Sequence, residues 1–288
     1  PPPPPPPPPF FLHAHPATAE AQESRGLGDV YKRQCKMKFY WDIMKILLTN
    51  DDGYKSLGIK YLHSCLLSYG DVIQAAPSKN MSACSSSLSV HNRVLVRNPS
   101  KNYYIINGTP SDCVHIASKG ILKKLPDIVF SGINFGSNLG DDVIYSGTVA
   151  GAIEGRHCKS SPVSISITSR EPKYLMDIND KLNFVLSHIF KQNYKSKNIF
   201  NVNIPDIPYN KIKGIKYTKL GTRKTSLKPI LNIENNRLYA EIGPVGNAIK
   251  SYESTDFNAI KSNFISITPL TVNMCDTKKI INRVFKPN

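Results

Sequence analysis

The sequence predicts a three-layer, doubly wound α/β fold, in which helices cover both faces of a mostly parallel, Rossmann-like sheet. Two observations lead to this prediction. Short apolar runs typical of buried parallel strands alternate with segments that carry helical periodicity or helix-capping residues. Polar loops rich in Asn, Asp, Ser and Gly follow three of these runs, as expected at the carboxyl ends of strands in such a sheet.

The first elements predict a βαβ unit. Residues 45–49 (KILLT) are an apolar run that leads into Asn-Asp-Asp-Gly, which indicates a buried strand. Apolar residues between Leu62 and Tyr69 recur at the i, i+3, i+4, i+7 spacing of an amphipathic helix, and Gly70 stands where a helix C-cap belongs. Residues 71–77 (DVIQAAP) supply the second strand.

The alternation continues through the rest of residues 44–170, which we expect to form the core domain. Thr109, followed by Pro110, is a typical helix N-cap. The further elements are, in order, strand YYIING (103–108), helix TPSDCVHIASKGI (109–121), strand PDIVFSG (126–132), helix SGTVAGAIEGRHC (146–158) and strand PVSISIT (162–168).

Residues 171–288 are expected to complete the core and to add a β-rich arm used for oligomerisation. Glycine, proline and β-branched residues are common in this part of the chain. The expected elements are a helix at 174–190, a strand at 198–205, a basic segment at 211–228, a hairpin at 229–243 and a strand at 263–274.

The composition is that of a soluble globular protein. Of the 288 residues 40% are hydrophobic, and no apolar stretch approaches the roughly 20 residues that span a bilayer. The net charge is +16, but the lysines are scattered, so we expect neither a stable nucleic-acid complex nor membrane association. The six cysteines show no paired spacing, which favours reduced thiols and a cytoplasmic location.

Residues 1–43 are expected to be a disordered leader outside the fold. Residues 1–9 are all proline, and the following segment has no consistent hydrophobic period. DVYKRQ (29–34) resembles the translation of a transposase end sequence used in preparing sequencing libraries. We therefore expect the leader to be artefactual and the natural start to be Met37 or, in better agreement with the following motif, Met44.

Two adjacent carboxylates, Asp51 and Asp52, follow the first strand, where their repulsion and partial desolvation require a positive partner. Polar loops at 78–87 (SKNMSACSSS) and 131–142 (SGINFGSNLGDD) should converge with them at the same edge of the sheet. Carboxylate, hydroxyl and amide oxygens suit Mg²⁺, Mn²⁺ or Ca²⁺. The three loops therefore predict a divalent-cation site, although Asn-Asp-Asp-Gly alone is also a common turn.

Residues 145–149 (YSGTV) open a helix whose free backbone N–H groups would hold a phosphate. Ser-Gly-Thr is equally typical of an ordinary N-cap. The glycines at 132, 136 and 140 match neither the dinucleotide-binding fingerprint nor a Walker A loop. No Ser/His/Asp set can be assigned to the separate histidines. A cation beside a helix N-terminus is an arrangement for phosphoryl transfer.

Several motifs occur together in one order: MKILLTNDDG, APSKNMSACSSSLS, GTPSDC and PDIVFSGINFGSNLGDDVIYSGTVAGAIEGR, followed more weakly by NVNIPDIP, IKGIKYTKLGTR, TDF and ISITPL. Through them the chain resembles the SurE family of nucleoside monophosphate phosphatases. The resemblance covers nearly everything after the leader.

The resemblance implies a SurE-type metallophosphatase, a phosphoric monoester hydrolase of the 5′-nucleotidase class. Its substrates would be nucleoside 5′- and 3′-monophosphates and also short-chain polyphosphate. It further implies a homodimer or homotetramer that exchanges its C-terminal arm. The implied ligands of one Mg²⁺ or Mn²⁺ per subunit are Asp51, Asp52, Ser82 and Asn134, and the implied phosphate contacts are Asn138, Ser146, Gly147 and Thr148.

The chain departs from the family pattern around the motif serine. Members usually carry a basic residue and a glycine where this chain has Met81 and Ala83, which puts substrate positioning in doubt more than metal binding. Asp51 and Asp52 are the expected catalytic residues. Asp51 would orient or deprotonate the attacking water, and a covalent aspartyl-phosphate is the less favoured alternative.

Two other classes of protein were weighed against this interpretation. A receiver-like phosphate-sensing module also has an acidic pair after its first strand, but it needs an Asp that closes the third strand, where this chain has Asn107 and Gly108. A basic nucleic-acid binder would show an affinity that falls steeply with salt.

Overall fold

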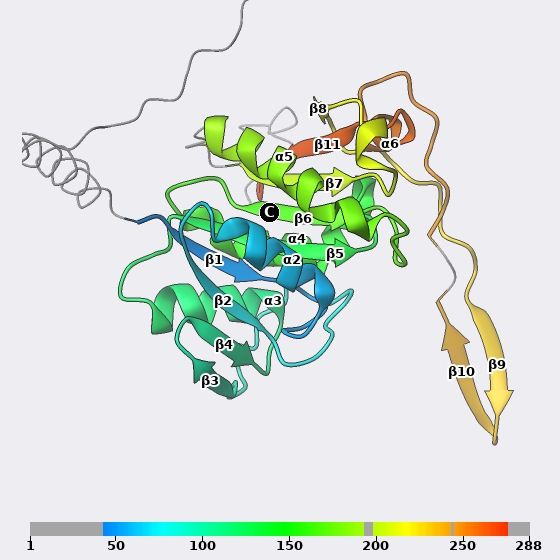
Figure 1. Cartoon of the computed structure of the whole chain (residues 1–288). Helices are drawn as coiled ribbons and strands as arrows, with labels where there is room; N and C mark the ends of the chain where they lie inside the picture. Colours follow the sequence, from blue (N-terminus) through cyan, green and yellow to red (C-terminus); the bar gives the residue numbers. More distant parts are fainter. Residues whose placement is uncertain (1–42, 193–197, 243–244, 276–288) are drawn as a thin grey trace, which may run out of the picture. The chain divides into compact units, whose positions relative to one another are not determined.

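The computed structural model describes residues 43–192, 198–242 and 245–275. The expected leader lies outside the described residues except for Ile43, and the compact unit considered below begins at Met44. Within it, helices cover both faces of a mostly parallel sheet, which confirms the predicted fold class (Figure 1).

The described strands form a nine-stranded sheet in the order β3-β4-β2-β1-β5-β6-β7-β11-β8. The strands from β4 to β7 in this order are parallel, and β3 and β11 pair antiparallel with β4 and β7. The parallel strands are β1 (Lys45–Thr49), β2 (Asp71–Pro77), β4 (Tyr103–Ile106), β5 (Ile128–Phe135), β6 (Val163–Ile167) and β7 (Ile199–Ile204). The others are β3 (Val96–Ser100), β8 (Ile215–Tyr217) and β11 (Ile265–Leu270).

β1 lies at the switch point of this sheet, because it pairs with β2 on one side and with β5 on the other. Its side chains alternate between the two layers. Ile46 and Leu48 pack in one apolar cluster, and Leu47 packs in the other. Both faces of β1 are therefore buried, as expected for a central parallel strand.

The main helices pack against these two faces (Figure 1). α2 (Leu57–Leu66) and α5 (Ile178–Gln192) contribute to the cluster of Ile46 and Leu48, and α3 (Pro110–Ile116) contributes to the cluster of Leu47. α4 (Gly147–Glu154) packs against α3 and β5. Its glycines permit a close approach, since a Cβ on Gly151 would lie 2.8 Å from the Oγ of Ser131.

The helix expected at 109–121 is confirmed in its extent, as α3 followed directly by a π-helical turn, Ala117–Ile121. Two other details of the sequence prediction are wrong. α2 ends at Leu66 with Leu67 as C-cap, and Gly70 instead lets the chain pass Met44, whose carbonyl oxygen would lie 2.3 Å from a Cβ. The loop expected to start at Ser131 begins only after Phe135, because β5 is longer than predicted.

Two described strands and one described α-helix were not predicted: β3, β8 and α6 (Asp256–Lys261). Every residue of β3 is exposed, so this edge strand has no apolar alternation in sequence. α6 has only six residues. Its N-cap Thr255 accepts a hydrogen bond from the backbone N–H of Asn258, and a threonine followed by Asp256 could have predicted the start of this helix from the sequence.

The predicted hairpin is confirmed as β9 (Ile230–Glu234) and β10 (Arg237–Glu241), an antiparallel pair. These two strands form a sheet of their own, and all ten residues are exposed. Separately, no helix in the described ranges is long and apolar enough to cross a membrane. The division of the chain into functional parts at residue 170 stays a prediction.

Candidate active site

The acidic pair lies at the carboxyl end of β1, at the switch point of the sheet. Asn50 forms the turn, since its side-chain amide donates to the carbonyl of Gly53 at 3.0 Å and to the hydroxyl of Ser56 at 2.8 Å. Gly53 has a φ of 95°, a left-handed conformation that favours glycine. The Asn-Asp-Asp-Gly segment is thus a structural turn that also presents two carboxylates.

Asp51 is buried against the N-terminus of α4. The hydroxyl of Thr148 donates to its Oδ1 at 2.7 Å, and a Cβ on Gly147 would lie 3.1 Å from its Oδ2. Burial, reinforced by the neighbouring charge of Asp52, raises the pKa of Asp51 to about 6, although the bond from Thr148 acts in the opposite direction. Asp51 therefore titrates close to neutral pH.

Asp52 is half-buried beside it. Burial raises the pKa of this carboxyl, and a hydrogen bond from the backbone of Phe135 at the end of β5 partly offsets the shift. Among the described residues the ion pairs involve Glu154, Glu253 and Asp142. No Lys, Arg or His side chain among the described residues therefore forms an ion pair with Asp51 or Asp52.

The loop that carries Ser82 is tied directly to the acidic pair, because the backbone N–H of Met81 donates to the carbonyl of Asp51 at 2.8 Å. The Ser82 hydroxyl donates to Oδ1 of Asn80 at 2.7 Å, which fixes its orientation. Ala83 has a φ of 58°, a left-handed conformation that costs an alanine about 1–2 kcal/mol. A glycine at this position, which the family resemblance implies, would avoid this cost.

Asn134 lies on β5, beside β1, and not in the following loop. Its Nδ2 donates to the carbonyl of Gly136 at 2.8 Å, so its side-chain oxygen is the atom that a cation would take. The four predicted cation ligands thus come from the ends of β1 and β5 and from the loop after β2.

An open cavity of about 740 Å³ brings most of the predicted site residues together. The members that line it are Asp51, Asp52, Ser82, Asn134, Asn138 and Ser146. Gly147 and Thr148 lie behind this surface, and the buried Thr148 hydroxyl is occupied by Asp51. Any phosphate contact of Gly147 or Thr148 would therefore use the backbone N–H groups of the helix start, of which that of Thr148 also interacts with the carboxylate of Asp51.

Asn138 is held by the neighbouring strands β6 and β7. Its backbone N–H donates to Oδ1 of Asn203 at 2.9 Å, and its carbonyl accepts from the side-chain amides of Asn201 and Asn203 at 2.8 and 2.9 Å. Its own Nδ2 donates to the hydroxyl of Ser166 at 2.7 Å. One N–H of the Nδ2 amide is thereby used, and the second is the donor that a phosphate would need.

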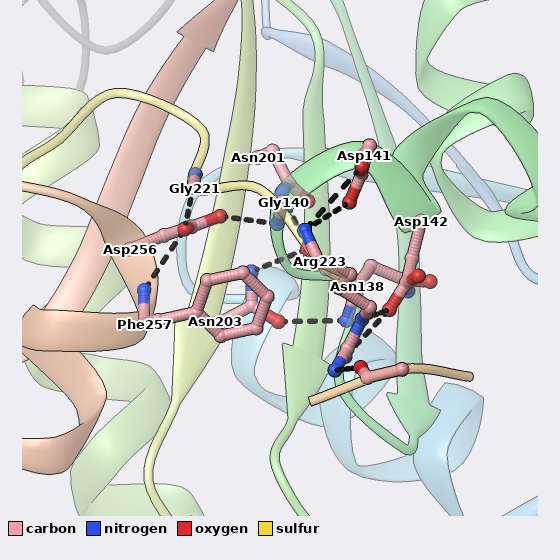
Figure 2. Close-up of polar contacts among 11 residues, drawn as sticks. Asn138, Gly140, Asp141, Asp142, Asn201, Asn203, Gly221, Arg223, Asp256 and Phe257 are labelled. Carbon is pink, nitrogen blue, oxygen red and sulfur yellow. Dashed lines mark hydrogen bonds and ion pairs between the residues drawn. The ribbon is translucent and has the colours of Figure 1, made fainter. Parts of the chain in front are cut away.

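The glycine-rich loop is clamped by residues from the last third of the chain (Figure 2). The buried carboxylate of Asp256 accepts from the backbone N–H groups of Gly140 at 2.7 Å, Gly221 at 2.8 Å and Phe257 at 2.9 Å. We call this set the Asp256 clamp. It fixes the start of the 3₁₀-helix Gly140–Tyr145, which leads directly into Ser146 and α4.

Arg223 makes a second connection to the same 3₁₀-helix (Figure 2). Its guanidinium pairs with Oδ2 of Asp142 at 2.6 Å and donates to the carbonyl of Gly246 at 3.1 Å. The ring of Phe257 lies 4.8 Å from the guanidinium carbon. The side chain is therefore held on three sides at the edge of the cavity, which it lines.

Sequence reasoning assigned no individual role to several residues that line the cavity, among them Asp142, Tyr145, Arg170 and Arg223. Arg170 follows β6, which neighbours β5, so the rule that ligands bind at the carboxyl ends of parallel strands could have found it. Arg223 stood in the weakly matching motif KLGTR, and nothing in its local pattern indicated the pairing with Asp142.

The residues present fit a hard divalent cation. The described residues contain no cluster of three or more His, Cys, Asp or Glu side chains that could hold a metal ion. A cation at the acidic pair would therefore combine two carboxylates with hydroxyl and amide oxygens, a ligand set that suits Mg²⁺ or Mn²⁺. The desolvated, uncompensated charge of Asp51 and Asp52 favours such a partner.

A doubly wound sheet whose switch point holds an acidic pair against a helix N-terminus defines an α/β protein with a site for an anionic ligand. The family model described as "Survival protein SurE" matches residues 46–227. The chain belongs to the SurE family. It shares the fold of the structure described as "Crystal Structure of Sure Protein from Aquifex aeolicus", with a TM-score of 0.71, 35% identity and coverage of 81% of this chain and 96% of that one.

Curated relatives match most of the chain. It is 41% identical over 237 residues to "5′-nucleotidase SurE" of Vesicomyosocius okutanii, covering 82% of this chain and 95% of the relative. It is 42% identical to the protein of the same name from Histophilus somni strain 2336, covering 80% and 94%. It is 41% identical to that of Legionella pneumophila strain Lens, covering 82% and 94%.

Proposed function

We propose that this chain is a divalent-metal-dependent 5′-nucleotidase that hydrolyses nucleoside 5′- and 3′-monophosphates, with short-chain polyphosphate as a secondary substrate. The observation that carries the proposal is the placement of Asp51 against the N-terminus of α4, with Asp52 next to it in the chain, in a family whose curated relatives are named 5′-nucleotidases. Neither the receiver-like module nor the nucleic-acid binder is supported by this family membership.

In this proposal Asp51, Asp52, Ser82 and Asn134 hold one Mg²⁺ or Mn²⁺ per subunit. The cation, when bound, would polarise a phosphoryl oxygen of the substrate. Asn138, Ser146 and the backbone N–H groups of Gly147 and Thr148 bind the phosphate, and the partial positive charge of the helix start stabilises the developing negative charge.

Asp51 is the residue proposed to orient the attacking water and to accept its proton. Burial raises the pKa of this carboxyl to about 6 when no cation is bound, and a bound cation would favour the ionised form that can accept a proton. Thr148, which donates to Oδ1 at 2.7 Å, leaves Oδ2 as the oxygen nearer the start of α4. The water would thus be activated next to the groups that bind phosphate.

Release of inorganic phosphate tests this function. We expect the full chain with Mg²⁺ or Mn²⁺ to release phosphate from a panel of nucleoside 5′- and 3′-monophosphates, and excess chelator to abolish the release. Re-addition of each cation should restore it. Phosphate release that persists unchanged in chelator would contradict metal dependence, and no release from any nucleotide would contradict the nucleotidase assignment.

We also propose that the hairpin β9–β10 pairs with another subunit in a homodimer or homotetramer. In the antiparallel register Ile233 faces Leu238 and Leu231 faces Ala240, so these four residues share one apolar face. Leu231, Ile233 and Leu238 are 61%, 76% and 66% exposed. An isolated two-stranded hairpin is marginally stable, so an apolar face of this kind favours burial against a partner.

Charged substitutions on this face test the assembly. The double substitution Ile233→Lys with Leu238→Lys should convert the oligomer to monomers, as measured by light scattering after size-exclusion chromatography. Asn232→Lys, on the opposite face of the same strand, is the matched control and should leave the mass unchanged. An oligomer that survives the double substitution would remove the hairpin from the interface.

A cytoplasmic location forms the last part of the proposal. The five cysteines in the described ranges are all free thiols. Cys65 and Cys113 are buried, and burial raises the pKa of both thiols. Free, buried thiols are typical of a reducing compartment.

A further inference from the structure

One wall of the cavity consists of side chains that neither the cation site nor the phosphate site uses. Asp142, Tyr145 and Arg223 all line the cavity. Asp142 and Tyr145 stand three residues apart in the 3₁₀-helix Gly140–Tyr145, and residues i and i+3 of a 3₁₀-helix lie on the same face. Arg223 pairs with Asp142 at 2.6 Å, and we call these three cavity-lining side chains the Tyr145 wall.

Tyr145 is the aromatic residue of this wall. Its side chain is 63% exposed. In the chain it directly precedes Ser146, the N-cap of α4. Its backbone is fixed, since Ser85 donates from its N–H to the carbonyl of Tyr145 at 3.2 Å and from its hydroxyl to the carbonyl of Ile144 at 2.6 Å. The backbone that carries this exposed ring is thus fixed next to the proposed phosphate site.

The charged part of the wall is internally compensated. Asp142 neutralises Arg223, and Phe257 packs against the guanidinium on another side. A second phosphate group would have to compete with Asp142 for Arg223. The wall therefore offers an aromatic face and a neutral pair of polar groups, a surface that suits a flat ring with hydrogen-bonding edges.

We propose that the Tyr145 wall binds the nucleoside part of the substrate, with the base stacked on Tyr145 and the Arg223–Asp142 pair beside it. This inference rests on the proposed nucleotidase function. A cavity of about 740 Å³ exceeds the room that one phosphate and one cation need, and falls within the range for small-molecule sites. Tyr145 is then the specificity-determining residue that separates nucleotides from phosphate esters without a base. Stacking tolerates every base, so the wall selects for a base without selecting among them.

A comparison of two substrates tests the wall. Adenosine 5′-monophosphate and ribose 5-phosphate carry the same phosphate ester, and only the first has a base. We expect Tyr145→Ala to lower kcat/KM for adenosine 5′-monophosphate by about 10- to 100-fold, as the loss of one stacked base predicts. For ribose 5-phosphate the same substitution should have little effect. Tyr145→Phe, which keeps the ring, should retain wild-type selectivity, and Tyr252→Ala, an exposed tyrosine outside the cavity lining, is the control.

Equilibrium binding of adenosine 5′-monophosphate to wild type and Tyr145→Ala, measured by calorimetry, gives a readout that does not depend on turnover. The affinity should fall by the same factor as kcat/KM. An equal loss for both substrates, or unchanged binding, would overturn the role of Tyr145. A wild-type protein that hydrolyses neither substrate yet binds the nucleotide through Tyr145 would contradict the proposed function and leave the wall supported.

Discussion

Replacement of Asp51 by asparagine should reduce phosphate release from nucleoside monophosphates by about 10²- to 10⁴-fold, the range attributed to general acid–base catalysis. Asparagine has nearly the same shape and can still accept the hydrogen bond from Thr148, so the fold should survive. It cannot accept a proton from water, and it is a weaker ligand for a hard cation. Initial rates at saturating Mg²⁺ or Mn²⁺ measure the effect.

Asp180→Asn is the matched control, because Asp180 is exposed on α5 and does not line the cavity. Circular dichroism and the melting temperature establish that both variants are folded. A folded, cation-loaded Asp51→Asn protein with wild-type turnover would remove Asp51 from the mechanism.

Asp51→Asn should lower activity, but in the presence of chelator the same substitution should raise the stability of the folded protein. The pKa of Asp51 is raised from 3.8 to about 6, so between these pH values the folded state binds more protons than the unfolded state. Stability therefore falls as the pH rises through this window, by on the order of 3 kcal/mol for a shift of this size. Asp51→Asn removes the cost, so it should melt higher than wild type at pH 7.5 and equally at pH 4.

Replacement of Asp256 by alanine should be the most destabilising change at the Asp256 clamp. It leaves the backbone N–H groups of Gly140, Gly221 and Phe257 without their acceptor. Each buried, unsatisfied donor costs roughly 1–3 kcal/mol, and relief of the desolvation that raises the pKa of Asp256 offsets part of the sum. A net loss of about 3 kcal/mol should lower the melting temperature by roughly 6–12 °C.

Asp256→Asn separates stability from activity. The amide oxygen can still accept from Gly221 and Phe257, which bind Oδ1, whereas the amide nitrogen would face the N–H of Gly140. Asp256→Asn should thus lose less stability than Asp256→Ala, while the displaced loop should lower turnover by about 10²-fold. Asp180→Ala serves as the control. Full activity in a folded Asp256→Ala protein would show that the clamp does not position the site.

The sequence predicted the fold class well because each central strand is buried on both faces and therefore appears as an uninterrupted apolar run. KILLT and PVSISIT are found as β1 and β6 with at most one residue of error at each end. β3 was missed for the opposite reason, since an exposed edge strand has no burial pattern to detect. The expected C-cap at Gly70 failed because glycine there serves close packing on Met44.

The candidate site was predictable where it follows single strands and unpredictable where it depends on tertiary contacts. The three segments that carry Asp51, Ser82 and Asn134 could be grouped by the rule that strand ends converge at the switch point, whereas the individual ligands came from the family resemblance. The bond from Thr148 to Asp51 and the pairing of Arg223 with Asp142 join residues 97 and 81 positions apart. No local periodicity encodes such contacts, so the Tyr145 wall became visible only in the structure.

The Asp256 clamp also bears on how this chain can be divided or recombined. The family match ends at residue 227, and every residue proposed to touch the cation or the phosphate lies before that point. The carboxylate that holds Gly140 lies after it. A chimera with its crossover at residue 227 would inherit the full set of reactive groups from one parent and their scaffold from another. Such hybrids should work only when the second parent supplies an acidic residue at this position, which makes Asp256 a criterion for choosing crossover points.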